Sequence, residues 1–510
     1  MTTYLFFSAG RLVLLLGLAA ASMALPGDQP LSRRWRVGLG ALVAVAALAF
    51  VNFGFFHAST RSHVHYWDAF HYFMGAKYLP ELGYTRLYEA TWVAGREMGA
   101  FANIDRIRDL PTYQVRDTRS ISADAVRARF TDARWRAFKH DLLVLGPRVP
   151  DWRRLLLDHG YNDPPPRAML LHVLLRWVPA TPATMTLLSS IDYLLIGGAL
   201  LAARAAFGPI AGALGAALFL LSFFARFDFI GGSILRWDWI AALVIGCAAF
   251  ARGAGMTAGV CIAYAALARL FPAAFLIPLA VKWAQHRRAS TVDRTLDRCL
   301  TAAAVVLVTV VATLVLAGDR VTLAEFVTKI RLHGETAFTN HVGLGTWLTF
   351  QTAPWSLHEG VQTVEPAALV AARPAPWVVP AISALYLGMA VPLILRARPL
   401  ESMMYAVPLI YCAVSPAGYY YSFLVLLVFL PWHAGAADRA RLLGIALLAL
   451  VSAGGYAFEI ITHDNLPLFH AVSTLLAVYF VAWLALEYSR LGLPGLVLAH
   501  PKASSRDHLV

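Results

Sequence analysis

The segment YWDAFHYFMGAKYLPELGYTRLY places an acid, Asp68, shortly after a hydrophobic stretch of the chain. Spacings of three and four residues predict that a helix here carries Asp68, His71 and Tyr72 on one face. A carboxylate held at a membrane surface is more often functional than stabilising. An ionised aspartate there could accept the proton of a substrate hydroxyl. The alternative is an exposed acid that only favours the start of the helix.

Histidines surround this aspartate in the sequence. His63 and His65 precede Asp68, and His71 follows it within a turn. Imidazole and carboxylate groups at this spacing could form a metal site. The alternative is a set of polar side chains at the membrane interface, which needs no ligand.

Two arginines fall at the predicted outer ends of hydrophobic spans. Arg236 belongs to GGSILRWDW and Arg269 to ALARLFP. A guanidinium group has a fixed charge and forked donors, which suit a phosphate group. Snorkelling anchors are the alternative, but arginines that only anchor a helix favour the cytoplasmic side.

Two more carboxylates accompany these arginines. Asp238 lies two residues beyond Arg236, either in a substrate site or in a local ion pair with Arg236 or Arg226. Asp163, in YNDPP, either assists Asp68 or initiates a turn before the prolines.

A later stretch, KIRLHGETAFTNHVGLGTW, concentrates donors for phosphate oxygens or sugar hydroxyls. Arg331 and His333 are candidates for phosphate, and Asn340 and His341 for substrate. Such a loop could close over a substrate and exclude water, or it could be a solvated connector. Tyr420, within a run of three tyrosines, could stack on a sugar, although aromatic belts at membrane interfaces explain many such residues.

The elements that must position these residues are membrane helices. Hydrophobic residues make up 59% of the chain and charged residues only 14%, which excludes a soluble protein. The apolar runs are continuous rather than alternating, so we predict an all-α polytopic membrane protein with about 13 transmembrane helices. The predicted spans are 4–24, 37–56, 185–203, 210–224, 234–251, 256–267, 271–283, 300–317, 378–396, 403–414, 422–432, 443–458 and 470–488.

Lysines and arginines cluster in the short loops between these spans, which predicts that those loops are cytoplasmic. The amino terminus and two long loops then lie outside. The predicted organisation is two amino-terminal helices (1–56), a long exterior loop with Asp68 (57–184), a helical block (185–317), a second exterior loop (318–376), a carboxy-terminal helical block (377–490) and a cytoplasmic tail (491–510). We therefore expect an integral protein of a bacterial plasma membrane, with its site on the exterior face.

Other classes of chemistry lack their motifs. The sequence has no Walker loop, dinucleotide fingerprint, nucleophile elbow or repeat of fixed period, so ATP-driven transport has no support. We expect no nucleic-acid partner. The four cysteines fall in or at the end of predicted spans and give neither a disulfide framework nor a zinc spacing. They are Cys247, Cys261, Cys299 and Cys412.

Several short motifs, in their order along the chain, resemble the glycosyltransferase C superfamily of integral membrane enzymes, especially its polyprenyl-phosphate-mannose-dependent mannosyltransferases. The motifs are YFMGAKYL and ELGYTRLYE after Asp68, YNDPP at 161–165, ALARLFP at 266–272 and SPAGYYYSF at 415–423. Arg269 stands where that group more usually has lysine. The extra amino-terminal span and the long, arginine-rich first loop depart from the family pattern and leave the acceptor and the subgroup open.

The resemblance implies transfer of a sugar, a hexose such as mannose, from a polyprenyl-phosphate donor to a glycan, lipid or protein acceptor, with inversion. Asp68 is then the general base. The expected donor-phosphate ligands are Arg269, Arg236, His333 and Arg331. The expected substrate-binding residues are His71, Tyr72, Asp163, Asp238, Asn340, His341 and Tyr420.

We expect no required cofactor or metal, because a carboxylate base and arginines can perform this chemistry without one. Membrane lipids are the other expected partner. The alternative function is a transporter or flippase of a lipid-linked or anionic substrate, in which the same charges line a path. A third interpretation is a non-catalytic membrane scaffold.

Overall fold

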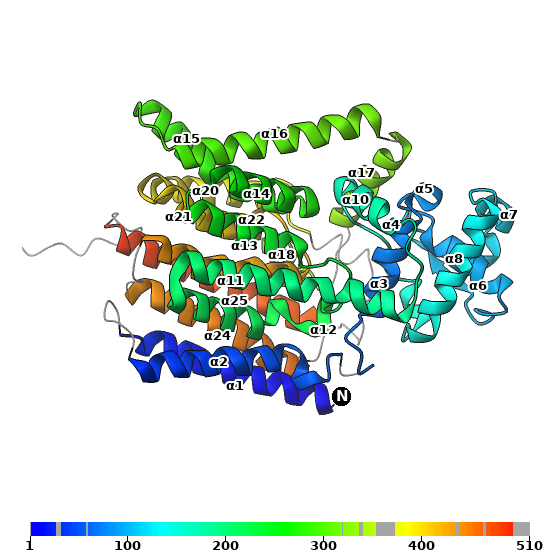
Figure 1. Ribbon diagram of the computed structural model, residues 1–510, viewed down its shortest axis with the longest axis horizontal. Coiled ribbons are helices and arrows are strands. Elements are labelled where there is room, and N and C mark those ends of the chain that lie inside the picture. The colour runs from blue at the N-terminus through cyan, green and yellow to red at the C-terminus, as the bar shows by residue number, and fades with distance from the viewer. Residues whose placement is uncertain are drawn as a thin grey trace, which may run out of the picture.

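The computed structural model describes residues 2–26, 32–57, 60–318, 320–335, 340–352, 373–434, 439–462 and 466–492. Within these ranges the chain is mostly helical, with one two-stranded sheet. Figure 1 shows long helices lying side by side in a bundle, with a smaller helical lobe at one end. The helical class predicted from the sequence is confirmed.

The bundle contains helices from both halves of the chain. Helices α1 and α24 pack together, as do α14 and α16, α13 and α14, and α24 and α25, so the two halves share one core. The bounds of the bundle helices are α1 (Thr2–Ala24), α2 (Arg33–Phe50), α11 (Pro182–Leu221), α13 (Asp238–Ala251), α14 (Gly255–Arg269), α15 (Leu276–Arg288), α16 (Arg294–Ala317), α20 (Val378–Arg396), α21 (Pro399–Ser402), α22 (Ala406–Ala413), α23 (Leu426–Phe429), α24 (Arg439–Thr462) and α25 (Leu466–Arg490).

Six helices in the described part of the chain are long and apolar enough to cross a membrane. Several other predicted spans form helices too short to cross alone; α13 has 14 residues and α22 only 8. The number of thirteen crossings therefore stays a prediction. The six segments are Leu5–Ala24, Pro182–Leu221, Arg294–Leu316, Val378–Arg396, Arg439–Thr462 and Pro467–Arg490.

Helix α11 spans 40 residues but is interrupted near its middle. Gly208 has φ of 91°, a conformation that suits glycine, and Pro209 follows it without a backbone donor. Two predicted spans, 185–203 and 210–224, lie on either side of this break. The sequence therefore located a real discontinuity in the helix.

The first predicted exterior loop, 57–184, is a folded lobe with its own hydrophobic core. Inside it, Trp135 and Phe138 stack with ring centres 5.6 Å apart, and Lys77 donates to Asp141 at 2.5 Å. Burial of these aromatic rings explains why so polar a segment is ordered. Its elements are α3 (Tyr66–Ala69), α4 (Gly75–Lys77), α5 (Leu79–Leu82), α6 (Leu87–Glu97), β1 (Arg106–Arg108), β2 (Val115–Asp117), α7 (Ala123–Arg127), α8 (Asp132–Leu145), α9 (Trp152–Leu155) and α10 (Pro165–Leu175).

Helix α10 joins this lobe to the bundle. Its inner face packs against α4, α14 and α16, while its outer face exposes large apolar side chains. Such a face is suited to lipid rather than water. The exposed residues on and just after α10 are Met169, Leu170, Val173, Leu174 and Trp177.

The second predicted exterior loop, 318–376, also contains helices. Helix α17 (Arg320–Glu335) lies against the lobe, and α18 (Leu344–Thr352) packs on α22 and α25. Residues 353–372 lie outside the described part of the chain.

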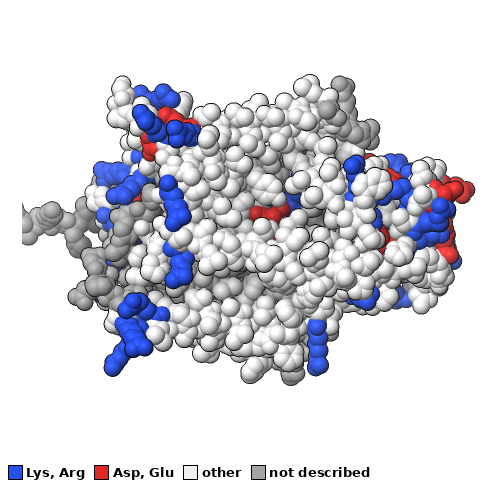
Figure 2. All heavy atoms as spheres, viewed as in Figure 1, with Lys and Arg blue, Asp and Glu red and all other residues white. Residues whose placement is uncertain are grey.

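Charge separates the two ends of the bundle. Figure 2 shows Lys and Arg side chains gathered at the end far from the lobe, and charges of both signs on the lobe. We call these the basic end and the lobe end. Helix α1 begins at the lobe end (Figure 1), so its start and the lobe share one side, as the predicted topology requires. On the face that Figure 2 shows, the belt between the two ends carries few charged side chains, among them a small acidic spot beside a basic one.

Candidate functional site

Asp68 lies in the short helix α3, where the lobe meets the bundle. Its Oδ2 accepts a hydrogen bond from Ser233 Oγ at 3.1 Å and lies 3.2 Å from Nε of Arg236. The backbone N–H of Asp68 donates to Nδ1 of His65, the residue that caps α3. Burial lowers the pKa of His65, which keeps this ring a neutral acceptor. The side chain of Asp68 is still 16% exposed, so its carboxylate is held in place but open to a substrate.

The loop that supplies Ser233 can approach α3 closely because of its glycines. Gly232 has φ of 71°, and a Cβ on it would lie 1.5 Å from the carbonyl oxygen of His63. The carbonyl of Gly232 accepts from the backbone N–H of His65 at 3.0 Å. No other residue type fits this position, so the GGS sequence sets the distance between Asp68 and Arg236.

Arg236 is buried, with 2% of its surface exposed. Its guanidinium carbon lies 4.0 Å from the centre of the Tyr72 ring and 5.5 Å from that of Tyr419, and Nη2 donates to the Tyr419 hydroxyl at 3.2 Å. Asp192 accepts the backbone N–H of Arg236 at 2.8 Å. Among the residues that the structure describes, Nη1 has no hydrogen-bond partner, and Nε has only the ion pair with Asp68.

A second arginine group lies across the tyrosines. Asp163 accepts a hydrogen bond of 2.6 Å from Nη1 of Arg269 and also pairs with Arg167. Arg167 in turn donates from Nε to Oδ2 of Asp238 at 2.8 Å. Nε and Nη2 of Arg269 are buried without a hydrogen-bond partner in the described residues.

Adjacent tyrosines connect the two arginines. Tyr419 contacts Arg236, and the Tyr420 ring lies 5.8 Å from the guanidinium carbon of Arg269. The centres of the two rings are 4.6 Å apart. We use the name charge cluster for the group Asp68, Tyr72, Asp163, Arg167, Arg236, Asp238, Arg269, Tyr419 and Tyr420.

Several guanidinium nitrogen atoms of the charge cluster lack a hydrogen-bond partner, which makes the cluster suited to an anion. A buried donor without a partner costs about 1–3 kcal/mol, and native proteins leave few of them. Apart from Nε of Arg236, which lies 3.2 Å from the Asp68 carboxylate, Arg236 and Arg269 together carry three such nitrogen atoms. An anion placed between them would satisfy these donors, and forked N–H groups are suited to phosphate oxygens.

The structure brings seven of the predicted residues into this cluster. They come from α3 and the turn after it, the segment just before α10, the loop before α13 and the first residue of α13, the end of α14 and the 3₁₀ segment Gly418–Val425. They are Asp68, Tyr72, Asp163, Arg236, Asp238, Arg269 and Tyr420.

His71 does not share the surroundings of Tyr72. The chain from Phe70 to Met74 forms a π-helical turn, which changes the spacing expected for an α-helix. His71 Nε2 instead lies 2.8 Å from the Tyr88 hydroxyl, inside the lobe. Burial lowers the pKa of His71.

Four other predicted residues lie outside the charge cluster. His333 is in ring contact with His159 and His341, and the backbone carbonyl of Asn340 accepts from Gly418 N–H at 2.8 Å. These contacts fix the segment after α17, which was predicted to be exterior, beside the motif that carries Tyr420. Arg331 is 80% exposed and pairs with Glu335, so the structure does not place it as a phosphate ligand.

The ion pair of Asp238 with Arg236 or Arg226, one of its two possible roles, does not form in the described part of the chain. Asp238 pairs with Arg167, whereas Arg236 pairs with Asp68 and Arg226 with Glu459. Side chains that are neighbours around the start of α13 have different partners. Nearness in sequence therefore did not predict these ion pairs.

Sequence reasoning missed several members of the site. Arg167 follows YNDPP directly, and its position four residues after Asp163 is the i,i+4 spacing of an ion pair. Tyr264 donates to Asp238 at 2.7 Å, and nothing local in the sequence indicates this contact. Tyr419 was predicted only as part of an aromatic run.

A metal site built from the histidines near Asp68 finds no geometric support. Within the described residues, no group of three His, Cys, Asp or Glu side chains is arranged to hold a metal ion.

Comparisons with models of protein families, with curated proteins and with solved structures found no match to this chain.

Proposed function

We propose that this protein is a membrane glycosyltransferase that moves a hexose from a polyprenyl-phosphate donor to an acceptor, with inversion, on the exterior face of a bacterial plasma membrane. One observation supports it above the others. A reachable carboxylate, Asp68, lies in one buried cluster with two arginines whose unpaired N–H groups suit a phosphate.

The reaction fits the positions of these groups. The acceptor hydroxyl gives its proton to Asp68 while its oxygen forms a bond to the anomeric carbon. The bond from that carbon to the phosphate oxygen breaks, and the electron pair leaves with the polyprenyl phosphate. Inversion requires the base and the leaving group on opposite faces of the sugar. Arg269 is therefore the principal phosphate ligand, because the tyrosines lie between it and Asp68.

In this proposal Arg236 contacts both the base, Asp68, and the donor phosphate. Its Nε side faces Asp68, while its unpaired Nη1 is available to the donor. The ring of Tyr72 beneath it fixes the guanidinium plane. Preorganised cations of this kind stabilise the charge that develops on a leaving phosphate.

The surroundings of the cluster suit a lipid-linked donor. Helix α10 begins next to Asp163 and carries Arg167 on its buried face, while its opposite face exposes apolar side chains such as Val173. Its neighbours α14 and α16 are apolar helices of the bundle. A polyprenyl chain in the outer leaflet could therefore bring its phosphate to the cluster from the side. The acceptor is a glycan, lipid or protein.

The test is sugar transfer by the purified protein in lipid nanodiscs, supplied with radiolabelled polyprenyl-phosphate hexoses and a crude membrane extract as acceptor. Asp68→Asn should lower transfer by about 10²- to 10⁴-fold. Because the change also removes the ion pair with Arg236, transfer is compared only in protein that remains folded and monodisperse in the nanodiscs. Full activity of Asp68→Asn would refute the assigned base. Substrate uptake into proteoliposomes without any product would favour a transporter or flippase instead.

A further inference from the structure

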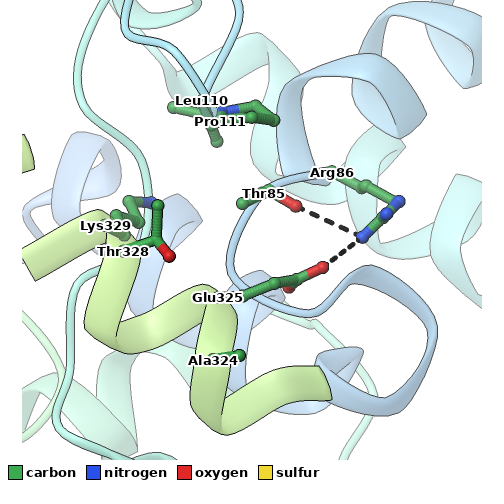
Figure 3. A pocket seen from close by; sticks show the side chains of 8 residues that line it. All are labelled: Thr85, Arg86, Leu110, Pro111, Ala324, Glu325, Thr328 and Lys329. Atoms are coloured by element: carbon green, nitrogen blue, oxygen red, sulfur yellow. Dashed lines mark hydrogen bonds and ion pairs between the residues drawn. The ribbon is translucent and has the colours of Figure 1, made fainter.

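A pocket of about 500 Å³ lies on the lobe, apart from the charge cluster. Its volume falls in the usual range for small-molecule sites. Figure 3 shows its wall, which three separate segments build: the loop before α6, the turn between β1 and β2, and one face of α17. The lining residues are Thr85, Arg86, Leu110, Pro111, Ala324, Glu325, Thr328 and Lys329.

The polar groups of this pocket combine opposite charges with neutral groups. Arg86 Nη1 donates to Glu325 Oε1 at 2.6 Å and to the Thr85 hydroxyl at 3.2 Å (Figure 3). Thr328 offers a second hydroxyl, and Leu110 an apolar surface. Glu325 would repel an anion, and the neighbouring arginine would repel a cation. Mixed donors and acceptors beside apolar carbon suit a neutral polyhydroxylated ligand, which is a saccharide.

A continuous path of contacts connects this pocket to the charge cluster. Lys329 donates to the backbone carbonyls of Tyr84 and Tyr161 at 2.8 and 2.9 Å. The Tyr84 ring stacks on that of Tyr161, and Tyr161 meets the ring of Tyr72 edge to face at 5.7 Å. Tyr72 lies against Arg236.

Two polar atoms along this path lack partners. The hydroxyls of Tyr84 and Tyr161 are buried, and neither has a hydrogen-bond partner within the described part of the chain. Buried hydroxyls usually find one. The path of contacts between the pocket and the charge cluster therefore carries two hydroxyl groups whose hydrogen bonds are not satisfied by the described residues.

We propose that this pocket binds a saccharide unit of the acceptor, which makes the acceptor a glycan-bearing molecule; the proposal rests on the proposed function. The pocket is separated from Asp68 by the tyrosine rings, so it holds a part of the acceptor remote from the reacting hydroxyl. Binding energy of this kind is equal in the ground and transition states, and it therefore lowers the acceptor KM without changing kcat.

The experiment uses Thr328→Trp, which fills the pocket from an exposed position on α17, with Val327→Trp as its matched control. Val327 is the neighbouring residue, is 61% exposed and does not line the pocket. Binding of methyl hexosides and neutral hexose disaccharides to the protein in nanodiscs is measured by saturation-transfer NMR. Kinetic constants are measured for donor and acceptor separately.

We expect the parent, Val327→Trp and Asp68→Asn proteins to bind at least one of these saccharides, and Thr328→Trp to bind none. We also expect Thr328→Trp to raise the acceptor KM at least 10-fold, with kcat and the donor KM unchanged. If no saccharide binds the parent, or if Thr328→Trp has the parent KM in a working transfer assay, the proposal is overturned while the glycosyltransferase function stands. If saccharides bind in this pocket but no donor supports transfer, the proposed function fails and the pocket is not an acceptor site.

Discussion

At the basic end of the bundle, two exposed arginines bond to carbonyl groups at the ends of neighbouring helices. Arg396 Nη1 donates to the carbonyl of Leu491 and Arg439 Nη1 to that of Met23, both at 2.9 Å. These are favourable positions for cations, because the carbonyl ends of helices carry partial negative charge. The remaining donors of these two exposed arginines can bond to water.

At the lobe end, arginines are buried against carboxylates and tyrosine rings. Arg236 and Arg269 are 2% and 5% exposed, and water cannot complete their hydrogen bonds in the same way. Asp68 and Asp163 compensate part of their charge. The same residue type is therefore exposed beside helix ends at one end of the bundle and buried with unsatisfied donors at the other.

The largest effect that distinguishes the two ends is expected for Asp163→Asn. This change removes a carboxylate shared by Arg167 and Arg269 and leaves buried positive charge uncompensated. Breaking a buried ion pair costs about 3–5 kcal/mol, so the unfolding temperature in nanodiscs should fall clearly.

The matched control is Asp297→Asn at the basic end. Asp297 lies 3.5 Å from Arg287, and both side chains are open to solvent. Exposed pairs contribute about 0–1 kcal/mol, so its unfolding temperature should stay near that of the parent. An equal fall in the unfolding temperature of the two variants would show that the buried ion pairs of the lobe end contribute no more stability than the exposed pair.

The next largest effect concerns the shape of the cation. Arg269→Lys keeps the charge but loses the forked donors, and we expect it to raise the donor KM about 10-fold or more. Arg236→Lys should lower kcat about 10²-fold, because the Arg236 guanidinium faces both Asp68 and the negative charge that develops on the leaving phosphate. Arg396→Lys, at the basic end, should leave both constants unchanged. Steady-state kinetics at saturating acceptor measure all three, and full activity in both lobe-end variants would exclude a bidentate phosphate site.

The sequence predicted which residues belong to the site better than it predicted the contacts between them. Composition and continuous apolar runs predicted membrane helices, because hydrocarbon leaves the backbone few other structures. Charge placement in short loops predicted that Asp68, Arg236 and Arg269 share one end, and the structure brings them together. Their partners could not be predicted, since the contact of Asp163 with Arg269 joins residues more than a hundred positions apart.

The two segments predicted to be exterior loops show a second limit of sequence reasoning. The lobe was predicted as a loop, because its many arginines obscure a core formed by residues such as Trp135 and Phe138. The π-helical turn after α3 separates His71 from Tyr72, and helical periodicity gives no sign of it. In contrast, the GGS sequence before Arg236 did carry a readable signal, because adjacent glycines often mark a close backbone approach.

Acid should destabilise the lobe end and not the basic end, and this is the smallest effect that we predict. Burial lowers the pKa of His57 to about 4, helped by the charge of His65 and opposed by Asp228 and by a bond to the carbonyl of Gly231. Burial lowers the pKa of His333 to about 3. His159 and Lys329 face His333 and lower its pKa further, while Asp158 opposes them.

The sign follows from proton binding in the two states. An unfolded histidine takes up a proton near pH 6.5, whereas these folded ones resist until about pH 4 and pH 3. The unfolded chain therefore binds more protons over that range, and the free energy of unfolding falls as the pH falls through it. Above pH 6.5 both states are neutral at these groups, and they contribute no pH dependence. Unfolding temperatures measured from about pH 7 down to about pH 4 should fall less steeply for His333→Gln than for the parent. The slope for His286→Gln, at the basic end, should match that of the parent. If the slope for His333→Gln also matches the parent, protonation of His333 does not weaken the contact between α17 and the lobe.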